Sequence, residues 1–241
     1  MTEAYPTLFS PVTLGRVTLR NRIAMAPLTR QMAHADGTPT AEMAAYYARR
    51  ARGGLGLVIT EGTYEQDAFQ SRAYLSQPGI ANAAHVAGWK KVCDAVHDNG
   101  AKIVIQLMHG GRVSDPRTLN GQPGVSASAT QSGGWTLYTD NDYEKTIRNI
   151  QGEWPKVTFP PARELSVEEL HAVADGFAAG AKRAVEAGAG VIRAQIHEQA
   201  SEAEIRASAQ RDGMQLMRED GERWVRDGIT SEAELLRVTK E

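Results

Sequence analysis

The sequence predicts an α/β fold in which short parallel strands alternate with helices, followed by an all-helical C-terminal segment. Continuous apolar runs rich in Ile and Val are typical of strands that are buried on both faces. Capped helical patterns lie between these runs, and this alternation favours (β/α) units around a parallel sheet. The alternation stops after Ile196 while helix caps continue, which predicts the helical tail.

The predicted elements follow one another with short connections. Residues 12–21 alternate apolar and polar side chains around Gly15 and predict a small hairpin. The predicted strands are 22–28, 55–62, 102–108 and 189–196. The predicted helices between them are 40–54, capped by Thr40, then 82–100, capped by Asn82, and 166–188, which opens with the capping box of Ser166 and Glu169.

Residues 110–165 interrupt the alternation after the third strand and are rich in Gly, Ser, Pro and Asn. Barrel active sites are built from such loops at the carboxyl ends of strands, so we expect this excursion to border a site. A disordered surface insertion is the alternative. In the tail, caps predict three helices at 201–211, 214–227 and 231–239. The chain therefore divides into a partial barrel, 1–191, and a three-helix tail, 192–241.

Composition excludes several classes of function. A net charge of −2 gives no electrostatic reason to expect a nucleic acid or an anionic membrane as partner. Cys93 is the only cysteine, which excludes an internal disulfide and a cysteine-based zinc site, and the histidines lack zinc spacing, so we expect no metal. No apolar run approaches the roughly 20 residues of a membrane span, and residues 1–9 lack the pattern of a signal peptide. We expect a cytoplasmic protein.

Candidate binding residues lie at the ends of the first three strand runs. The first ends with Pro27 and Thr29, the second with Gly62, and the third with Gln106 and His109. Gly62 lets a ligand approach the backbone, and the amide of Gln106 can both donate to and accept from a ring edge. Each residue alone has a simpler explanation: Thr29 can cap a strand, Gly62 can turn the chain, and His109 can be a surface histidine. Together, at three successive strand ends, they predict a site.

Five ordered blocks of sequence resemble the old yellow enzyme family, the flavin-dependent NAD(P)H:alkene oxidoreductases. The blocks are LFSPVTLGRVTLRNRIAMAPLTR (8–30), YYARRARGGLGLVITEGT (46–63), GWKKVCDAVHDNGAKIVIQLMHGGR (88–112), PGVSASA (123–129) and PARELSVEEL to FAAGAKRAVEAGA (161–189). The resemblance implies a TIM-type (β/α) barrel that holds FMN at the carboxyl ends of its strands. It also implies that this chain contains only the N-terminal half of that barrel, about four strands.

The resemblance assigns roles to the strand-end residues. Pro27 and Thr29 would lie against the flavin, with the Thr29 hydroxyl hydrogen-bonded to the ring carbonyl. Gly62 would leave room beside the ring, and Gln106 would bind its pyrimidine edge. The family reaction carries a hydride from NAD(P)H to the flavin and then to the C=C bond of an activated alkene, a small-molecule substrate.

The chain departs from the family pattern at the predicted fourth strand. The substrate-binding histidine of the family falls at Ala194 and no tyrosine follows to deliver a proton, so the catalytic residues are unassigned. A displaced role for His197 is the alternative, but Glu198 and Gln199 beside it do not continue the family pattern. The family's arginine and its glycine-rich phosphate grip have no counterpart. We therefore expect weak FMN binding, impaired activity, and self-association that covers the open sheet.

The tail resembles a different family. Residues 192–241, with ASEAEIR (200–206) and LRVT (236–239), are similar to the C-terminal helical end of type II secretion and type IV pilus assembly ATPases. This resemblance places a junction near residues 190–192. The alternative function is a catalytically inactive fusion or half-barrel scaffold whose helical tail binds a secretion or pilus-type partner.

Overall fold

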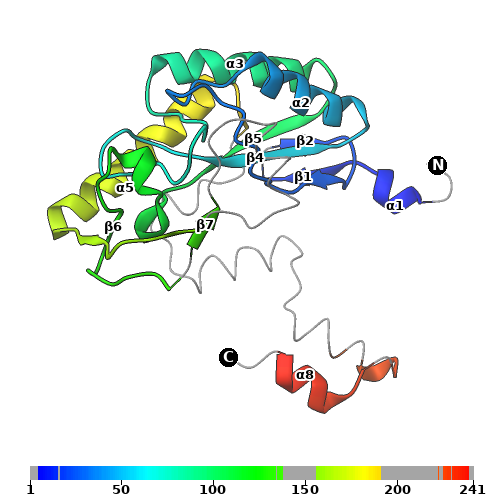
Figure 1. The fold of residues 1–241 in the computed structure, drawn as a ribbon. Coiled ribbons are helices and arrows are strands. Elements are labelled where there is room, and N and C mark those ends of the chain that lie inside the picture. Colours follow the sequence, from blue (N-terminus) through cyan, green and yellow to red (C-terminus); the bar gives the residue numbers. More distant parts are fainter. Residues whose placement is uncertain are drawn as a thin grey trace. The chain divides into compact units, whose positions relative to one another are not determined.

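A computed structural model describes residues 5–15, 17–133, 135–137, 156–190, 222, 225–228 and 230–238. Packing divides the chain into two compact units, Met1–Ile192 and Arg193–Glu241. The elements of the first unit (Figure 1) are, in order, α1 Pro6–Phe9, β1 Val12–Leu14, β2 Val17–Leu19, β3 Ala24–Met25, α2 Ala41–Arg52, β4 Leu57–Thr63, α3 Ala83–His97, β5 Lys102–Leu107, the 3-10 helices Gly111–Val113 and Pro116–Leu119, β6 Val125–Ser126, β7 Trp135–Leu137, β8 Lys156–Thr158, β9 Arg163–Glu164 and α5 Val167–Glu186.

A three-stranded parallel sheet lies at the centre of the first unit, in the order β3-β4-β5. Val58 of β4 pairs with Met25 on one side and with Ile103 on the other. The spatial order follows the chain order, as it does around a barrel wall, whereas a doubly wound sheet reverses its order at a switch point. The structure confirms the first three predicted strands, although β3 is regular over only two residues.

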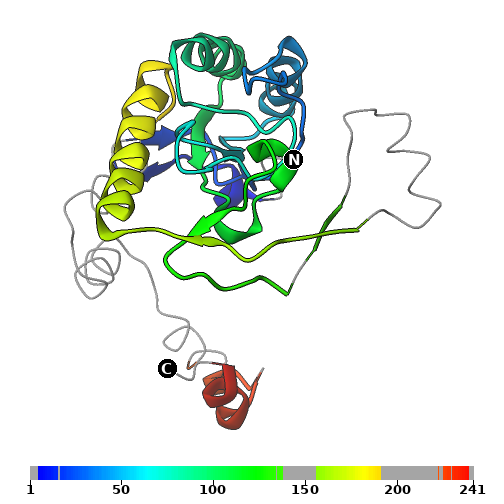
Figure 2. The ribbon, with the colours of Figure 1, turned by 60° about the vertical axis from the view of Figure 1, so that its left-hand side comes forward.

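Three helices, α2, α3 and α5, pack beside one another along the strands and form an arc around them in Figure 2. Their N-termini lie at the predicted caps. The side chains of Thr40 and Asn82 each accept a main-chain N–H of the first turn, and Ser166 and Glu169 form the predicted capping box. Each such cap stabilises its helix by about 1 kcal/mol, which is why local sequence fixes these starts.

The hydrophobic core lies between the helices and the sheet. The indole N–H of the fully buried Trp89 donates to the carbonyl of Gly79 at 2.9 Å, so this large side chain is buried without an unpaired polar group. Helix α5 packs closely against Glu65, just beyond β4, because it has no side chain at Gly180. A Cβ at Gly180 would lie 2.8 Å from the Cβ of Glu65. The largest fully buried apolar side chains of the core are those of Trp89, Tyr47, Met43, Ile80, Ile103, Val58, Val92 and Val96.

Strands β1 and β2 form the predicted antiparallel hairpin, and its turn contains Gly15 at a φ of 57°. Arg20 follows the hairpin, and its guanidinium donates to the main-chain carbonyls of Ala51, Leu55 and Asn99 at 2.5–3.1 Å. These carbonyls lie at or just beyond the C-terminal ends of α2 and α3, where a positive charge is favourable. Arg20 therefore ties the hairpin to both helices.

The predicted excursion connects β5 to α5, and its described part carries short elements of its own. Strands β6 and β9 pair in parallel, and β7 and β8 pair antiparallel. The guanidinium of Arg112 donates to the hydroxyls of Ser126, Ser128 and Thr130, which fixes the beginning of the excursion to β6. Residues 134 and 138–155 lie outside the described part.

The predicted fourth strand, 189–196, lies outside the described residues from 191 onwards. The N–H of Gly190 donates to the carbonyl of Ile103 at 2.8 Å. After α5 the chain thus returns to β5 on the side away from β4, where a fourth parallel strand would pair.

The second unit contains α8, Glu232–Val238, which confirms the last predicted helix. The N–H of Leu235 donates to the carbonyl of Ser231 at 3.0 Å, and the Leu235 side chain is buried. The helix predicted at 201–211, and most of the one at 214–227, lie outside the described residues, so the three-helix tail as a domain stays a prediction. In the described part of the chain, no helix has the length and apolar character that crossing a bilayer needs.

Candidate functional site

Strand β4 contains one extra residue at its carboxyl end. Ile59 pairs with Val104, and the ladder resumes with Gly62 paired to Gln106, so β4 advances three residues while β5 advances two. Such a β-bulge switches the faces to which the following side chains point. As a result Gly62 and Gln106 lie on the sheet face that points away from the helices, whereas the side chain of Glu61 points toward α2.

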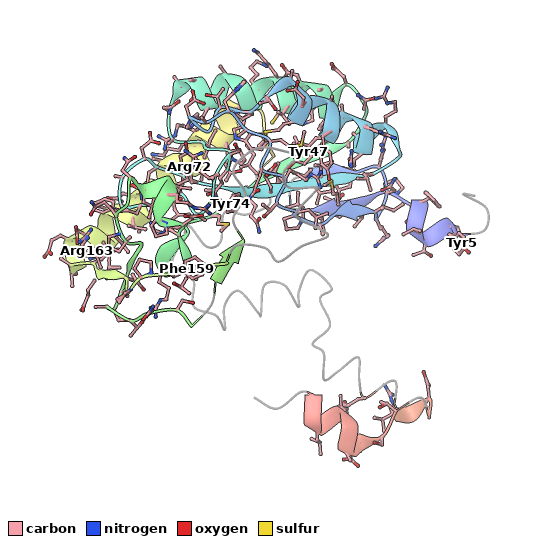
Figure 3. All side chains as sticks on the ribbon, viewed as in Figure 1. Tyr5, Tyr47, Arg72, Tyr74, Phe159 and Arg163 are labelled. Carbon is pink, nitrogen blue, oxygen red and sulfur yellow. The ribbon has the colours of Figure 1, made fainter. Side chains whose placement is uncertain are left out.

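The structure brings the predicted strand-end residues to one end of the sheet. Gly62 and Gln106 are ladder neighbours. Thr29 follows β3, and its hydroxyl donates across a long 3.4 Å contact to the hydroxyl of Tyr74, which in turn donates to the carbonyl of Gly62 at 3.2 Å. Tyr74 lies close to β4 (Figure 3). Pro27, Thr29 and Gln106 are exposed, whereas Gly62 is buried. Their contacts with a flavin stay a prediction.

The space beside Gly62 is occupied, contrary to the expectation that this glycine leaves room for a ligand. A Cβ at Gly62 would overlap the side chain of Met108, lying 3.2 Å from its Cβ and closer still to its sulfur. Methionine has three rotatable bonds and adapts its shape readily. A ring placed against Gly62 would therefore require Met108 to turn aside.

A fully buried carboxylate, that of Glu61, connects the ends of two strands. Its Oε2 accepts the main-chain N–H groups of Arg30 at 2.8 Å and Gln31 at 3.2 Å. Its Oε1 accepts the Tyr47 hydroxyl at 3.2 Å, and the oxygen of that hydroxyl accepts the N–H of Glu61 at 3.1 Å. Burial raises the pKa of Glu61, and these hydrogen bonds act against that shift. Burial likewise raises the pKa of the Tyr47 phenol far above its ordinary value.

Residues 73–77 lie next to Gly62, and two of their side chains donate hydrogen bonds to its carbonyl. The buried side chain of Gln77 donates to the Gly62 carbonyl at 3.1 Å and accepts the N–H of Ala73 at 2.7 Å. Burial raises the pKa of Tyr74 to about 12, so its hydroxyl keeps its proton at neutral pH. Sequence reasoning missed Tyr74 and Gln77 because a loop has no periodicity. It also missed Glu61, although an acid within the apolar run LVITEGT is a signal.

The strand-end histidine has a structural role. The Nδ1 of His109 accepts the N–H of Gly111 at 2.9 Å, which leaves the proton on Nε2, the atom that lies 3.0 Å from the carbonyl of Phe69. His109 is half-buried and connects the loop that follows β5 to residue 69. Ala194 and His197 lie outside the described residues. Within the described ranges, no three His, Cys, Asp or Glu side chains are grouped closely enough to hold a metal ion.

A cavity of about 410 Å³ lies away from the strand-end residues. It is lined by the loops 64–72 and 118–122 together with Asp36. Pro27, Thr29, Gly62 and Gln106 do not line it. The strand ends, unlike this cavity, combine converging polar groups with the carboxyl ends of parallel strands.

Comparison with known proteins finds a matching family and several relatives. The model of the NADH:flavin oxidoreductase / NADH oxidase family matches residues 7–201. A chanoclavine-I aldehyde reductase of Penicillium roqueforti is 38% identical over 186 residues, which are 75% of this chain and 43% of that protein. A probable flavin mononucleotide-dependent alkene reductase of Leishmania infantum is 33% identical over 187 residues, which are 77% of this chain and 48% of that protein.

The structure of an old yellow enzyme homologue from Zymomonas mobilis matches 76% of this chain and 46% of its own length, with a TM-score of 0.64 and 35% identity. This likeness confirms the predicted partial barrel. The chain spans less than half the length of these three relatives. The family match extends to residue 201, past the predicted junction near 190–192. The resemblance of residues 192–241 to secretion and pilus ATPases stays a prediction.

Proposed function

Since this chain belongs to the NADH:flavin oxidoreductase / NADH oxidase family, we propose that its first unit supplies one wall of an FMN site in an NAD(P)H-dependent reductase of activated alkenes. The convergence of Thr29, Gly62 and Gln106 at the carboxyl ends of neighbouring parallel strands carries this proposal. The Leishmania relative, named an FMN-dependent alkene reductase, supports both the cofactor and the substrate class.

The donor set at the strand ends suits a planar ring with carbonyl and N–H groups on its edge. The exposed amide of Gln106 can donate and accept side by side, and the hydroxyl of Thr29 can donate to a ring carbonyl. Bound FMN would supply hydride transfer, and the chain's own residues would bind and orient its ring. The single proton of the Thr29 hydroxyl would turn from Tyr74 to the ring carbonyl, and Met108 would turn aside to admit the ring.

We assign no described residue to the phosphate of FMN. A charge-assisted hydrogen bond to a phosphate contributes about 1.5–3 kcal/mol, which corresponds to roughly ten- to a hundredfold in affinity. The 241-residue chain should therefore hold FMN more weakly than a full-length relative does. We also expect slow turnover, because the groups that hold the substrate and deliver the proton are unassigned.

The proposal is tested by titrating the purified 241-residue chain with FMN and following visible absorbance and flavin fluorescence. We expect a yellow complex, with at least tenfold weaker binding in Thr29→Ala and in Gln106→Ala. Thr13→Ala, an exposed threonine in β1, is the matched control and should bind FMN like the unaltered chain. The proposal would be overturned if the unaltered chain did not bind FMN, or if the Thr29→Ala and Gln106→Ala variants bound FMN as tightly as the control.

Turnover is tested on the FMN complex without oxygen. NADH or NADPH should bleach the oxidised flavin band, and an activated alkene should restore it. If the flavin is bleached but the alkene does not restore the band, the cofactor site stands and the alkene reductase activity is excluded.

We also propose that the chain self-associates. Leu28, just beyond β3, is 54% exposed, and Ile59 and Val104 lie half-buried on the sheet face that points away from α2, α3 and α5. A strictly monomeric protein in light scattering at micromolar concentrations would contradict this.

The scaffold with a docking tail finds no support in the similarities above, and a cytoplasmic location stays a prediction.

A further inference from the structure

We propose that Glu61 is a positioning residue that holds Thr29 in place through the turn that follows it. The inference rests on the proposed function in one respect, that Thr29 is the residue that meets FMN. The turn consists of Arg30 and Gln31, and the carboxylate of Glu61 is the acceptor of both their N–H groups.

The turn has the geometry of an anion-binding nest. Gln31 has a φ of 55°, in the left-handed region that L-residues seldom occupy. The N–H groups of Arg30 and Gln31 point toward the same acceptor. Both donate to a single oxygen of Glu61, at 2.8 and 3.2 Å. A left-handed conformation is unfavourable for a residue other than glycine, and hydrogen bonds to a buried carboxylate offset this strain. The turn therefore depends on the carboxylate.

The same carboxylate links two strand ends in the candidate site. Thr29 immediately precedes the nest, and Glu61 immediately precedes Gly62. The two hydrogen bonds with Tyr47, one in each direction, orient the carboxylate from the side of α2. The position of Thr29 is thus set by Glu61 through the backbone of the following turn, and only a long 3.4 Å contact joins its hydroxyl to Tyr74. A displacement of about 1 Å at such a group can change binding or rate a hundredfold.

The bulge in β4 makes this arrangement possible. In an unbulged strand, Glu61 would point away from the helices, on the same face as Ile59. The extra residue turns Glu61 toward Tyr47 and places Gly62 opposite Gln106 on the other face. One local irregularity therefore sets both the positioning carboxylate and the glycine of the candidate site.

A purely structural role for Glu61 makes a different prediction, since it would loosen the whole first unit. Amide hydrogen exchange of the 241-residue chain separates the two roles. In Glu61→Ala we expect the amides of Arg30 and Gln31 to exchange about 10- to 100-fold faster, because two charge-assisted hydrogen bonds are lost. The amides of α3 should be unchanged. Glu61→Gln should be intermediate, because a neutral amide oxygen can still accept both N–H groups.

Glu65→Gln is the matched control. Glu65 is as fully buried as Glu61 and also accepts a hydrogen bond, from the Ser71 hydroxyl at 2.5 Å, but it does not contact the turn. Exchange at residues 30 and 31 should be normal in this variant. Unchanged exchange at the turn in Glu61→Ala, or an equal increase across α3, would overturn the proposal.

FMN titration then tests whether Glu61 acts through Thr29. We expect Thr29→Ala to alter the FMN dissociation constant and absorbance shift in the unaltered chain but to have little further effect in the Glu61→Ala background. Fully additive effects would overturn the positioning role. If the unaltered chain takes up no FMN, the proposed function fails, and the exchange experiment alone decides whether Glu61 fixes the turn.

Discussion

Replacement of Tyr47 by Phe removes a single oxygen from the centre of the first unit. Tyr47 is completely buried, and its hydroxyl donates to the Glu61 carboxylate while accepting the N–H of Glu61. The phenylalanine ring keeps the packing against Trp89, whose centroid lies 6.5 Å from that of Tyr47. The substitution therefore isolates the two hydrogen bonds from the burial of apolar surface.

The expected loss follows from the partners of the hydroxyl. A hydrogen bond to an ionised group contributes about 1.5–3 kcal/mol and one between neutral groups about 0.5–1.5 kcal/mol. Both hydrogen bonds that Tyr47→Phe removes are long, with donor–acceptor distances of 3.2 and 3.1 Å, so we take the lower halves of these ranges. The free energy of unfolding should fall by about 2–3 kcal/mol. For a domain of this size this loss lowers the melting temperature by about 4–12 °C.

Urea unfolding followed by tryptophan fluorescence measures this loss. Tyr46→Phe is the matched control, since Tyr46 is the adjacent residue, is half-buried, and packs its ring against the guanidinium of Arg50 at 3.3 Å. Its hydroxyl makes no hydrogen bond that we find among the described residues, so the control should lose no more than about 0.5 kcal/mol. Equal stability of the two variants would refute the view that Tyr47 and Glu61 form an energetically important buried pair.

Three further predictions concern groups elsewhere in the first unit. Burial raises the pKa of the Cys93 thiol to about 12, so a thiol reagent at mildly alkaline pH should label it only after unfolding; rapid labelling of the native protein would contradict its burial. Arg20→Lys should lower the free energy of unfolding by about 1–2 kcal/mol in urea titrations, because one ammonium cannot reach all the helix-end carbonyls that the guanidinium fork reaches. Burial raises the pKa of Glu61 in the folded state above its ordinary value of 4.5, so the folded state binds more protons at this residue than the unfolded state does. The free energy of unfolding should therefore fall as pH rises from 4.5 through the raised pKa, and should level off above it. Glu61→Gln should abolish this part of the pH dependence, and an unchanged pH profile would show that Glu61 is not its source.

Much of the fold could be predicted because its signals are local. The caps at Thr40, Asn82 and Ser166 involve side chains that bond the backbone within three residues, and the structure shows each of them. Apolar runs likewise located three neighbouring parallel strands. Burial on both faces is a property of each run by itself, so no knowledge of its neighbours was needed.

Part of the candidate site could be predicted for the same reason. Thr29 follows β3, whereas Gly62 and Gln106 lie near the carboxyl ends of β4 and β5. The carboxyl ends of parallel strands meet at one edge of a sheet, so sequence alone placed the three residues together. The occupation of the space at Gly62 by Met108 could not be predicted, since a rotamer depends on the packing around it.

The sequence by itself determined the order of the hairpin, the three strands of the parallel sheet and the helices α2, α3 and α5, the starts of these helices, and the family. Only the tertiary structure decided which face of the sheet each β4 side chain occupies. The bulge is defined by the pairing of Ile59 and Gly62 with residues of β5 that lie more than forty residues further along the chain. The bonds of Glu61 with Tyr47 and with the turn at Gln31 have the same origin. They join residues far apart in sequence, and a periodic pattern carries no record of such contacts.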